Sequence, residues 1–255
     1  MKKIVSALVL VGIAGVPALA TAGDSPHSVA ANLGFASDYR FRGISQTFED
    51  PAVQGGFDYA HASGFYLGTW ATNVEPDELA GSNMEWDLYG GYTFNLGDVA
   101  VNVGGLYYGY PGKDKAAYGA DPNTFELYAG ATWKWLNLKY SHSTTKLFGL
   151  SDSSGSGYLE ANAGFELPAE ITLNLHVGRQ FVAGDIAPGV SHDDYTDWKI
   201  GVSKPVLGFN VGLAYVDTNV KSSNVTWGGM TSFAKGSKTA DLADSTVVLT
   251  VGKTF

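Results

Sequence analysis

The feature that most constrains the fold is the alternation of apolar and polar residues in about twelve segments of the chain. In the clearest of them, Met84, Trp86 and Leu88 alternate with Glu85 and Asp87. A period of two indicates a β-strand with one apolar and one polar face, and helical periodicity is almost absent. The chain is therefore predicted to be all-β. The alternating segments are 28–42, 53–60, 65–72, 84–96, 99–108, 125–135, 136–141, 158–167, 171–180, 197–203, 207–215 and 245–255.

The connections between these segments are alternately short and long. An outer-membrane barrel separates its connections in this way, with short turns on the periplasmic side and long loops outside. The predicted fold is an antiparallel up-and-down transmembrane β-barrel of about 12 strands, with both termini periplasmic. The short connections are 61–64, 95–98, 135–137, 167–170 and 204–208. The long ones are 43–52, 73–83, 109–123, 143–157, 182–194 and 217–244.

A soluble exported β-sandwich is the alternative, because one face of its strands is also apolar. Aromatic residues near strand ends favour the barrel, since the two membrane interfaces attract aromatic girdles. In a barrel the apolar parity faces lipid and the polar parity faces the lumen. For the first segment this predicts that Tyr39 and Phe41 face lipid headgroups, whereas Asp38, Arg40 and Arg42 line the lumen.

The N-terminus has the layout of a secretory signal peptide. Lys2 and Lys3 precede an apolar run that is too short to span a bilayer, and the small residues 20–22 follow it. We predict cleavage after Ala22, which leaves 23–255 as a single outer-membrane barrel domain of a Gram-negative bacterium. The formal net charge of −9 argues against nucleic acid as a partner. The chain has no cysteine, so it relies on neither disulfides nor thiolate-bound zinc.

The last ten residues, TVVLTVGKTF, resemble the C-terminal assembly signal of bacterial outer-membrane proteins. Val247, Leu249, Val251 and Phe255 are in register on one face of this last segment, and Lys253 departs from the usual apolar residue. The resemblance implies that the barrel-assembly machinery is a partner. An ordinary edge strand would also alternate.

The stretch SDYRFRGISQT (37–47) resembles a motif that the TorF-like family of proposed porins, also catalogued as Gcw_chp proteins, carries shortly after the signal peptide. EWDLYGGYTF (85–94), LYYGYPG (106–112) and DYTDWKIGVS (194–203) are similar to later blocks of the same family. The resemblance covers nearly the whole mature chain. It implies an outer-membrane barrel without an established substrate and brings no catalytic residues.

The charged residues at the polar positions of these segments predict a lumen with both acids and bases and a mild excess of acids. We interpret it as a porin for passive diffusion of small polar solutes, with selectivity from pore width and charged side chains. The alternatives are a closed structural or adhesive barrel that acts through its loops, and a lumen sealed by ion pairs. The outer surface would contact membrane lipid and lipopolysaccharide, and no cofactor is expected. The predicted lumen-lining residues are Asp38, Arg40, Arg42, Asp58, Glu85, Asp87, Glu126, Lys134, Lys139, Glu160 and Lys199.

Two further hypotheses are less favoured. A lipid hydrolase would need a nucleophile and a base that converge, but Ser141 and Ser143 lie on the opposite parity from His142. We therefore predict that the protein is not an enzyme. Acidic loops at 75–78 and 191–194 could bind Ca²⁺, but they lack the spacing of a calcium loop, and no metal site is predicted.

Overall fold

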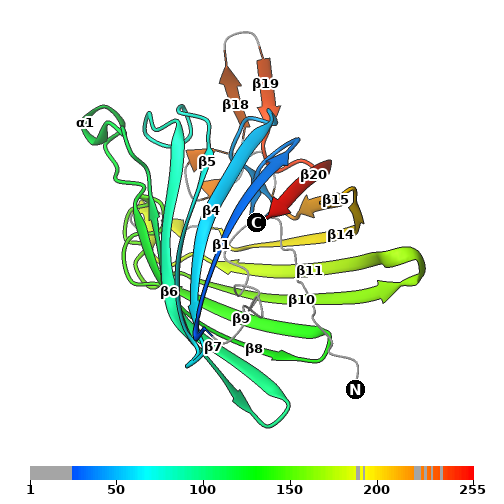
Figure 1. Ribbon diagram of the computed structural model, residues 1–255. Coiled ribbons are helices and arrows are strands. Elements are labelled where there is room, and N and C mark those ends of the chain that lie inside the picture. The colour runs from blue at the N-terminus through cyan, green and yellow to red at the C-terminus, as the bar shows by residue number, and fades with distance from the viewer. Residues whose placement is uncertain are drawn as a thin grey trace.

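The computed structural model describes residues 25–187, 190–191, 193–220, 225–226, 229–230, 232–235 and 238–255. The predicted signal peptide, 1–22, lies outside the described residues. Twelve antiparallel strands close into a barrel, which confirms the predicted fold class (Figure 1). These strands are β1 (His27–Ala36), β4 (Ala52–His61), β5 (Phe65–Asn73), β6 (Met84–Leu96), β7 (Val99–Gly109), β8 (Thr124–Trp133), β9 (Leu136–Ser143), β10 (Gly157–Leu167), β11 (Ile171–Phe181), β14 (Tyr195–Val206), β15 (Phe209–Thr218) and β20 (Thr246–Thr254).

Each barrel strand pairs with its neighbours in the chain, and β1 closes the ring by pairing with both β4 and β20. The predicted alternation of connection lengths is present. The turn between β6 and β7 has two residues, Gly97 and Asp98, whereas the next connection runs from residue 110 to 123. β1 begins opposite the end of β4, next to the short turn at residues 62–64. The start of β1 and the end of β20 therefore both lie at the short-turn end of the barrel.

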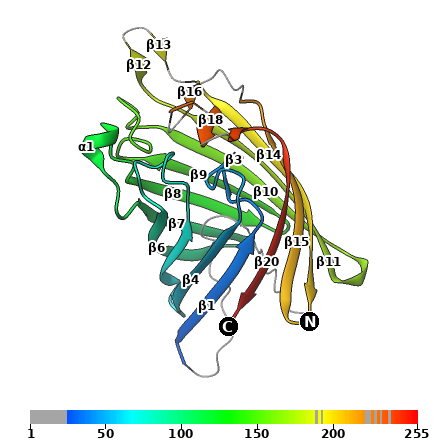
Figure 2. The ribbon, with the colours of Figure 1, turned by 90° about the horizontal axis from the view of Figure 1, so that it is seen from above.

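Short elements belong mostly to the long connections, and Figure 2 shows their hairpins gathered at one end of the barrel, away from the C-terminus. β3 lies inside the ring of strands in this view. The short elements are β2 (Arg40–Phe41), β3 (Ile44–Ser45), α1 (Lys115–Tyr118), the 3₁₀ turn η1 (Pro168–Glu170), β12 (Asp185–Ala187), β13 (Val190–Ser191), β16 (Val225–Thr226), β17 (Gly229–Met230), β18 (Ser232–Lys235) and β19 (Lys238–Asp241).

The two faces of the barrel wall differ in polarity. Large apolar side chains such as Val29 and Phe57 point outward and are 71 % and 63 % exposed. Polar side chains such as Glu126 and Asn162, of the opposite parity, are buried inside the ring. None of the helices in the described part of the chain is long and apolar enough to cross a membrane. An apolar exterior around a polar interior is the arrangement of an outer-membrane barrel.

Candidate functional site

The connection between β1 and β4 folds into the barrel, and we call residues 37–51 the inward hairpin. β2 and β3 pair with each other, and Arg42 and Gly43 form the turn between them with φ of 47° and 84°. Two-residue hairpin turns with two positive φ values match the twist of the flanking strands. A Cβ on Gly43 would collide with Thr218 Cγ2 and Asp197 Cβ, so a glycine lets the hairpin tip rest on the barrel wall.

The prediction that residues 28–42 form one strand with Tyr39 and Phe41 toward lipid is wrong. β1 ends at Ala36, and both aromatic side chains are 2 % exposed. The alternation continues past Ala36 because the hairpin is also extended chain. Its apolar side chains are covered by other loops, not by lipid.

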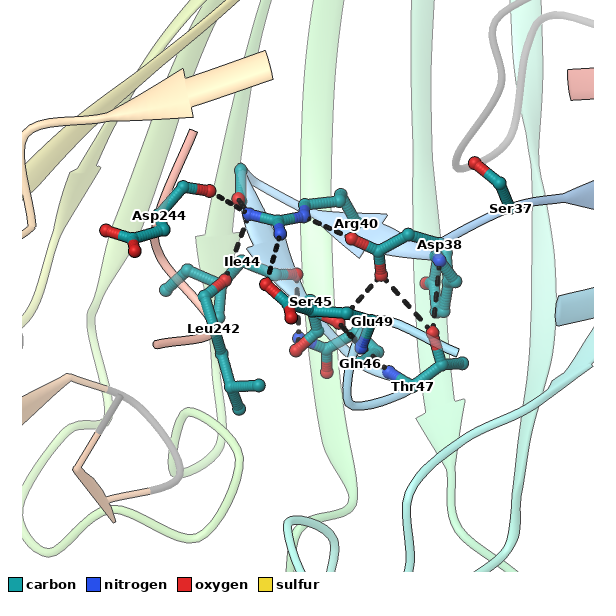
Figure 3. A network of polar contacts seen from close by, with 12 residues as sticks. Ser37, Asp38, Arg40, Ile44, Ser45, Gln46, Thr47, Glu49, Leu242 and Asp244 are labelled. Atoms are coloured by element: carbon teal, nitrogen blue, oxygen red, sulfur yellow. Dashed lines mark hydrogen bonds and ion pairs between the residues drawn. The ribbon is translucent and has the colours of Figure 1, made fainter. Parts of the chain in front are cut away.

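An ion pair fixes the base of the inward hairpin (Figure 3). Arg40 Nε donates to Asp38 Oδ2 at 2.6 Å, and Ser45 Oγ donates to Asp38 Oδ1 at 2.7 Å. Arg40 Nη1 also donates to the carbonyl oxygens of Leu242 and Asp244, at 3.1 and 2.6 Å. The hairpin is thereby tied to the connection that precedes β20, and Asp38 and Arg40 compensate each other.

Arg42, at the tip of the hairpin, contacts two separated parts of the wall. Its Nη2 donates to both carboxylate oxygens of Glu126 on β8, at 2.9 and 2.8 Å, and its Nη1 donates to Gln180 Oε1 on β11 at 2.7 Å. The guanidinium also lies 4.7 Å from the ring centroid of Phe41 and 4.2 Å from that of Tyr158. Burial alone would lower the pKa of Arg42, but the Glu126 carboxylate raises it above its ordinary value. The hairpin tip is therefore held by a permanent, buried charge.

An apolar core surrounds the hairpin at the loop end of the barrel. Phe148 packs edge-to-face against Phe41, Tyr108 and Tyr110, with ring centroids 5.3 to 6.3 Å apart. The inward hairpin and these buried side chains form a unit that we call the cap. Its further buried apolar members are Tyr39, Ile44, Phe48, Val74, Leu79, Leu147, Val182, Tyr195, Leu242 and Ala243.

The acidic residues of β6 lie directly under the cap. Tyr39 and Tyr110 donate their hydroxyls to the two carboxylate oxygens of Glu85, at 2.9 and 3.0 Å. Burial, together with Glu85 and Asp87, raises the pKa of both phenols well above its ordinary value, so they remain donors. Asp87 is 1 % exposed, and its Oδ1 has no hydrogen-bond partner.

On β4 to β8, inward tyrosines lie flat against the wall because the neighbouring strand offers a glycine. A Cβ on Gly91 would come within 2.6 Å of the Tyr66 hydroxyl, and one on Gly104 within 2.5 Å of the Tyr128 hydroxyl. The two rings approach from β5 and β8, and their hydroxyls hydrogen-bond over β6 and β7. Tyr66 also donates to Asn102 on β7 at 2.7 Å. The rings therefore line the wall and do not cross the lumen.

Tyr89 repeats this arrangement. Its ring covers Gly68, where a Cβ would approach ring atoms within 2.5 to 2.7 Å, and its hydroxyl donates to Asp58 at 2.6 Å. Asp58 is one of the predicted lumen-lining residues, and Asn32 also donates to it, at 3.3 Å.

On β9 to β14 the inner wall carries a continuous polar network. Lys139 Nζ pairs with Glu160 Oε1 at 2.9 Å, and Asn162 donates to Glu160 Oε2 at 3.0 Å. Asn162 Oδ1 lies 2.7 Å from His176 Nδ1, and His176 Nε2 lies 2.8 Å from Asp197 Oδ2. This wall therefore holds acids and bases side by side.

Among the predicted lumen-lining residues, Asp38, Arg40 and Arg42 lie on the inward hairpin and not on the barrel wall, and Lys134 lies outside the lumen. Lys134 is exposed in the two-residue turn between β8 and β9, has a φ of 55°, and places its ammonium 4.3 Å from the ring centroid of Trp133. A tight turn interrupts the alternation, so parity counted across it fails. Lys199 is half-buried opposite His176 in the β11–β14 register.

Several residues that the site uses are absent from the predicted set. Asn162, His176 and Gln180 share the polar parity of the predicted carboxylates, so the pattern contained them, but neutral and weakly basic side chains were not selected. Tyr158 and the tyrosines over glycines carry no sequence signal, since a tyrosine suits either face.

The hydrolase hypothesis finds no geometric support at its named residues. Ser141 and Ser143 are buried, whereas His142 is exposed on the other face of β9. Among the residues that the structure describes, no group of three or more His, Cys, Asp or Glu side chains could hold a metal ion.

A closed ring of antiparallel strands with an apolar exterior, a charged interior and long loops at one end defines the class of porin-like outer-membrane barrels. Residues 20–255 match the family model described as "Bacterial protein of unknown function (Gcw_chp)". The chain belongs to this family. The finer TorF-like resemblance stays an expectation from the sequence, and no curated protein matches the chain.

Solved porins share the fold at low identity. The structure described as "KdgM porin" has a TM-score of 0.51 and 8 % identity over 89 % of this chain and 98 % of its own. "KdgM porin in complex with disordered oligogalacturonate" has a TM-score of 0.50 with the same identity and coverage. A structure of the NanC porin has a TM-score of 0.50 and 10 % identity over 88 % of this chain and 98 % of its own. At this identity the likeness shows the fold.

Proposed function

We propose that this protein is an outer-membrane channel for passive diffusion of small polar solutes. The observation that carries the proposal is the inner wall, where Tyr66, Tyr89 and Tyr128 lie flat over glycines of adjacent strands. A barrel built only for stability would fill its interior with side chains that cross it. Seating large side chains against the wall keeps the middle of the barrel free for water and solute.

The inward hairpin sets the size limit of the proposed channel. It reaches from β1 to Glu126 on β8 and Gln180 on β11, so a solute has to pass between the hairpin and the wall. Asp38 and Arg40 are paired with each other and therefore act as hairpin supports, while the charge of Arg42 is buried and paired with Glu126.

Charge favours cations and neutral solutes over anions. In the inner wall, acids outnumber bases, and Asp87 Oδ1 has no hydrogen-bond partner. An oligogalacturonate, with which one neighbouring porin was solved, is a chain of acidic sugars and is not the solute class that this wall suits. The acids are Asp58, Glu85, Asp87, Glu126, Glu160 and Asp197, and the basic residues that face them are Lys139, His176 and Lys199 on the wall and Arg42 in the hairpin.

We further propose the orientation and partners that the sequence implies. The cap and the long loops face the exterior and contact lipopolysaccharide, and both termini are periplasmic after removal of residues 1–22. The barrel-assembly machinery recognises the last strand through Val247, Leu249, Val251 and Phe255, of which Val247, Leu249 and Phe255 are exposed on the outer surface.

The second candidate function is a closed structural or adhesive barrel, and the cap favours it. Buried side chains from most of the long connections pack around Phe41 and Phe148, which is more extensive than a constriction requires. In that case the outer surface of the loops performs the function.

Single-channel recording in planar bilayers tests the proposal. Refolded barrel should show discrete conductance steps with cation preference, measured as a reversal potential in a salt gradient. Replacing residues 38–46 by a Gly-Ser linker of equal length should enlarge each step. Absence of steps in the wild-type barrel, together with steps in the linker variant, contradicts the channel proposal and supports the closed barrel.

A further inference from the structure

The contacts of His176 show which of its ring nitrogens face hydrogen-bond acceptors. Asn162 donates its amide N–H to Glu160 Oε2 at 3.0 Å, which directs Asn162 Oδ1 toward His176 Nδ1 at 2.7 Å. The opposite amide orientation would place its oxygen against the Glu160 carboxylate. Nδ1 faces an acceptor and therefore carries a hydrogen.

The second ring nitrogen also faces acceptors. His176 Nε2 lies 2.8 Å from Asp197 Oδ2 and 3.1 Å from the Tyr158 hydroxyl, whose own hydrogen is donated to Asp197 Oδ1 at 2.8 Å. A proton between Nε2 and Asp197 Oδ2 makes this contact a hydrogen bond, whereas without it a lone pair faces a carboxylate. The His176–Asp197 pair is a proton-binding site in the lumen.

This pair also supports the tip of the inward hairpin. Gly43 packs against the side chain of Asp197 so closely that a Cβ would collide with it. Arg42, the adjacent turn residue, stacks on Tyr158, whose hydroxyl is bound to the same carboxylate. A change in the position of Asp197 therefore moves both surfaces on which the hairpin tip rests.

From this geometry we infer that the proton held between His176 and Asp197 latches the inward hairpin, and that its loss at higher pH releases the hairpin tip. Without that proton the Nε2 lone pair repels the carboxylate, and Asp197 turns away from beneath Gly43. The inference concerns the regulation of the proposed channel and rests on that function: the barrel is more closed in acid and more open in mildly alkaline solution.

The titratable and charged groups around His176 come from four elements. Tyr158 and Glu160 on β10 and Asp197 on β14 face the ring, and Glu160 Oε2 lies 3.8 Å from Nδ1. The bases nearby are Lys199 on β14, Lys139 on β9 and Arg42 in the hairpin.

The test is single-channel recording of the intact barrel in planar bilayers from about pH 5 to about pH 8, the range in which histidine titrates. Mean current through the wild-type barrel should rise roughly twofold or more, as a population shift toward the released hairpin requires. H176Q should abolish this rise, because glutamine does not titrate. H142Q, on the outer face of β9, should retain it. A pH-independent current in the wild type, or a rise that persists in H176Q, overturns the inference.

A second measurement separates the inference from the proposed function. Because the chain has no cysteine, spin labels can be placed at Glu49→Cys in the hairpin segment and Asp152→Cys in the β9–β10 loop. The distribution of distances between the two spin labels should broaden as the pH rises in the wild-type background and stay constant with H176Q. A pH-dependent distance without any current contradicts the channel but not the latch. A constant distance in the wild-type background contradicts the latch whatever the current.

Discussion

Residues 27–36 and the inward hairpin that follows them have the same alternation of apolar and polar residues, but they lie in opposite environments. In β1, Val29 and Leu33 point outward and are 71 % and 57 % exposed. In the hairpin, Tyr39 and Phe41 continue the same parity and are almost completely buried. Alternation therefore identifies extended chain with two different faces, but it does not tell which solvent each face meets.

The charged side chains of the two regions also differ in what surrounds them. In barrel strands, inward carboxylates such as Glu85 are bound by tyrosines of the cap. In the hairpin, Arg42 must form a salt bridge to Glu126 because it leaves water completely. The hairpin is therefore held by a few specific buried contacts, whereas the strands are held by backbone hydrogen bonds to their neighbours.

The largest effect is expected from breaking the Arg42–Glu126 pair. Arg42→Ala leaves the Glu126 carboxylate buried without its partner and should lower the free energy of unfolding by about 3–5 kcal/mol. The measurement is urea unfolding in detergent micelles, followed by tryptophan fluorescence.

A double variant serves as its control. Arg42→Met with Glu126→Leu removes both charges and should recover much of the loss, since two apolar side chains of similar volume can replace a buried ion pair. Equal losses in the single and double variants would show that the tip is held by packing and not by charge.

The next effect compares two phenylalanines in the two environments. Phe41→Ala should cost about 3 kcal/mol, as truncation of a buried phenylalanine does, because it opens a cavity against Tyr108 and Phe148. Phe57→Ala, at an outward position that is 63 % exposed, should cost well under half as much in the same unfolding experiment. Comparable losses would mean that Phe41 does not lie in a packed core.

A smaller effect is expected at the glycines beneath the tyrosines. Gly91→Ala places a methyl group against the Tyr66 hydroxyl and the Val103 carbonyl, and should cost about 1–3 kcal/mol through overpacking. It should also push the ring into the lumen and reduce the conductance step. Gly164→Ala, where the added methyl group meets nothing within 4 Å, is the matched control and should leave both quantities nearly unchanged.

The smallest effect contrasts an exposed ion pair with the buried one. Burial alone would raise the pKa of Asp121, but hydrogen bonds from Lys115, the Asn123 backbone and Lys113 lower it below its ordinary value of 3.8. The stabilisation is therefore complete above that pH and is lost as the pH falls through the lowered pKa of the folded state. Because the Lys115 and Asp121 side chains are 58 % and 40 % exposed, Asp121→Asn should cost only a few tenths of a kcal/mol near neutral pH. The measurement is the free energy of unfolding at pH 7 and pH 3, and a loss at pH 7 as large as that of Arg42→Ala would contradict the contrast.

Much of the fold was predictable, and part of the site was not. Strand number and the two classes of connection follow from local patterns, because each barrel strand repeats the same outward and inward alternation. The alternation also predicts that Glu85, Asp87, Glu126 and Glu160 face the interior of the barrel. The error at Lys134 arose where a turn of two residues interrupted the parity.

Patterns in the amino-acid sequence are sufficient to predict an antiparallel barrel with a charged interior and long loops at one end. These properties are local, since period-two alternation and connection length can be counted along the chain. Three features depend on the closed ring: residues 37–51 turn inward, Arg42 reaches Glu126 and Gln180, and His176 lies against Asp197. Such contacts join residues up to 138 positions apart, and their free energy depends on which groups the closed ring brings together.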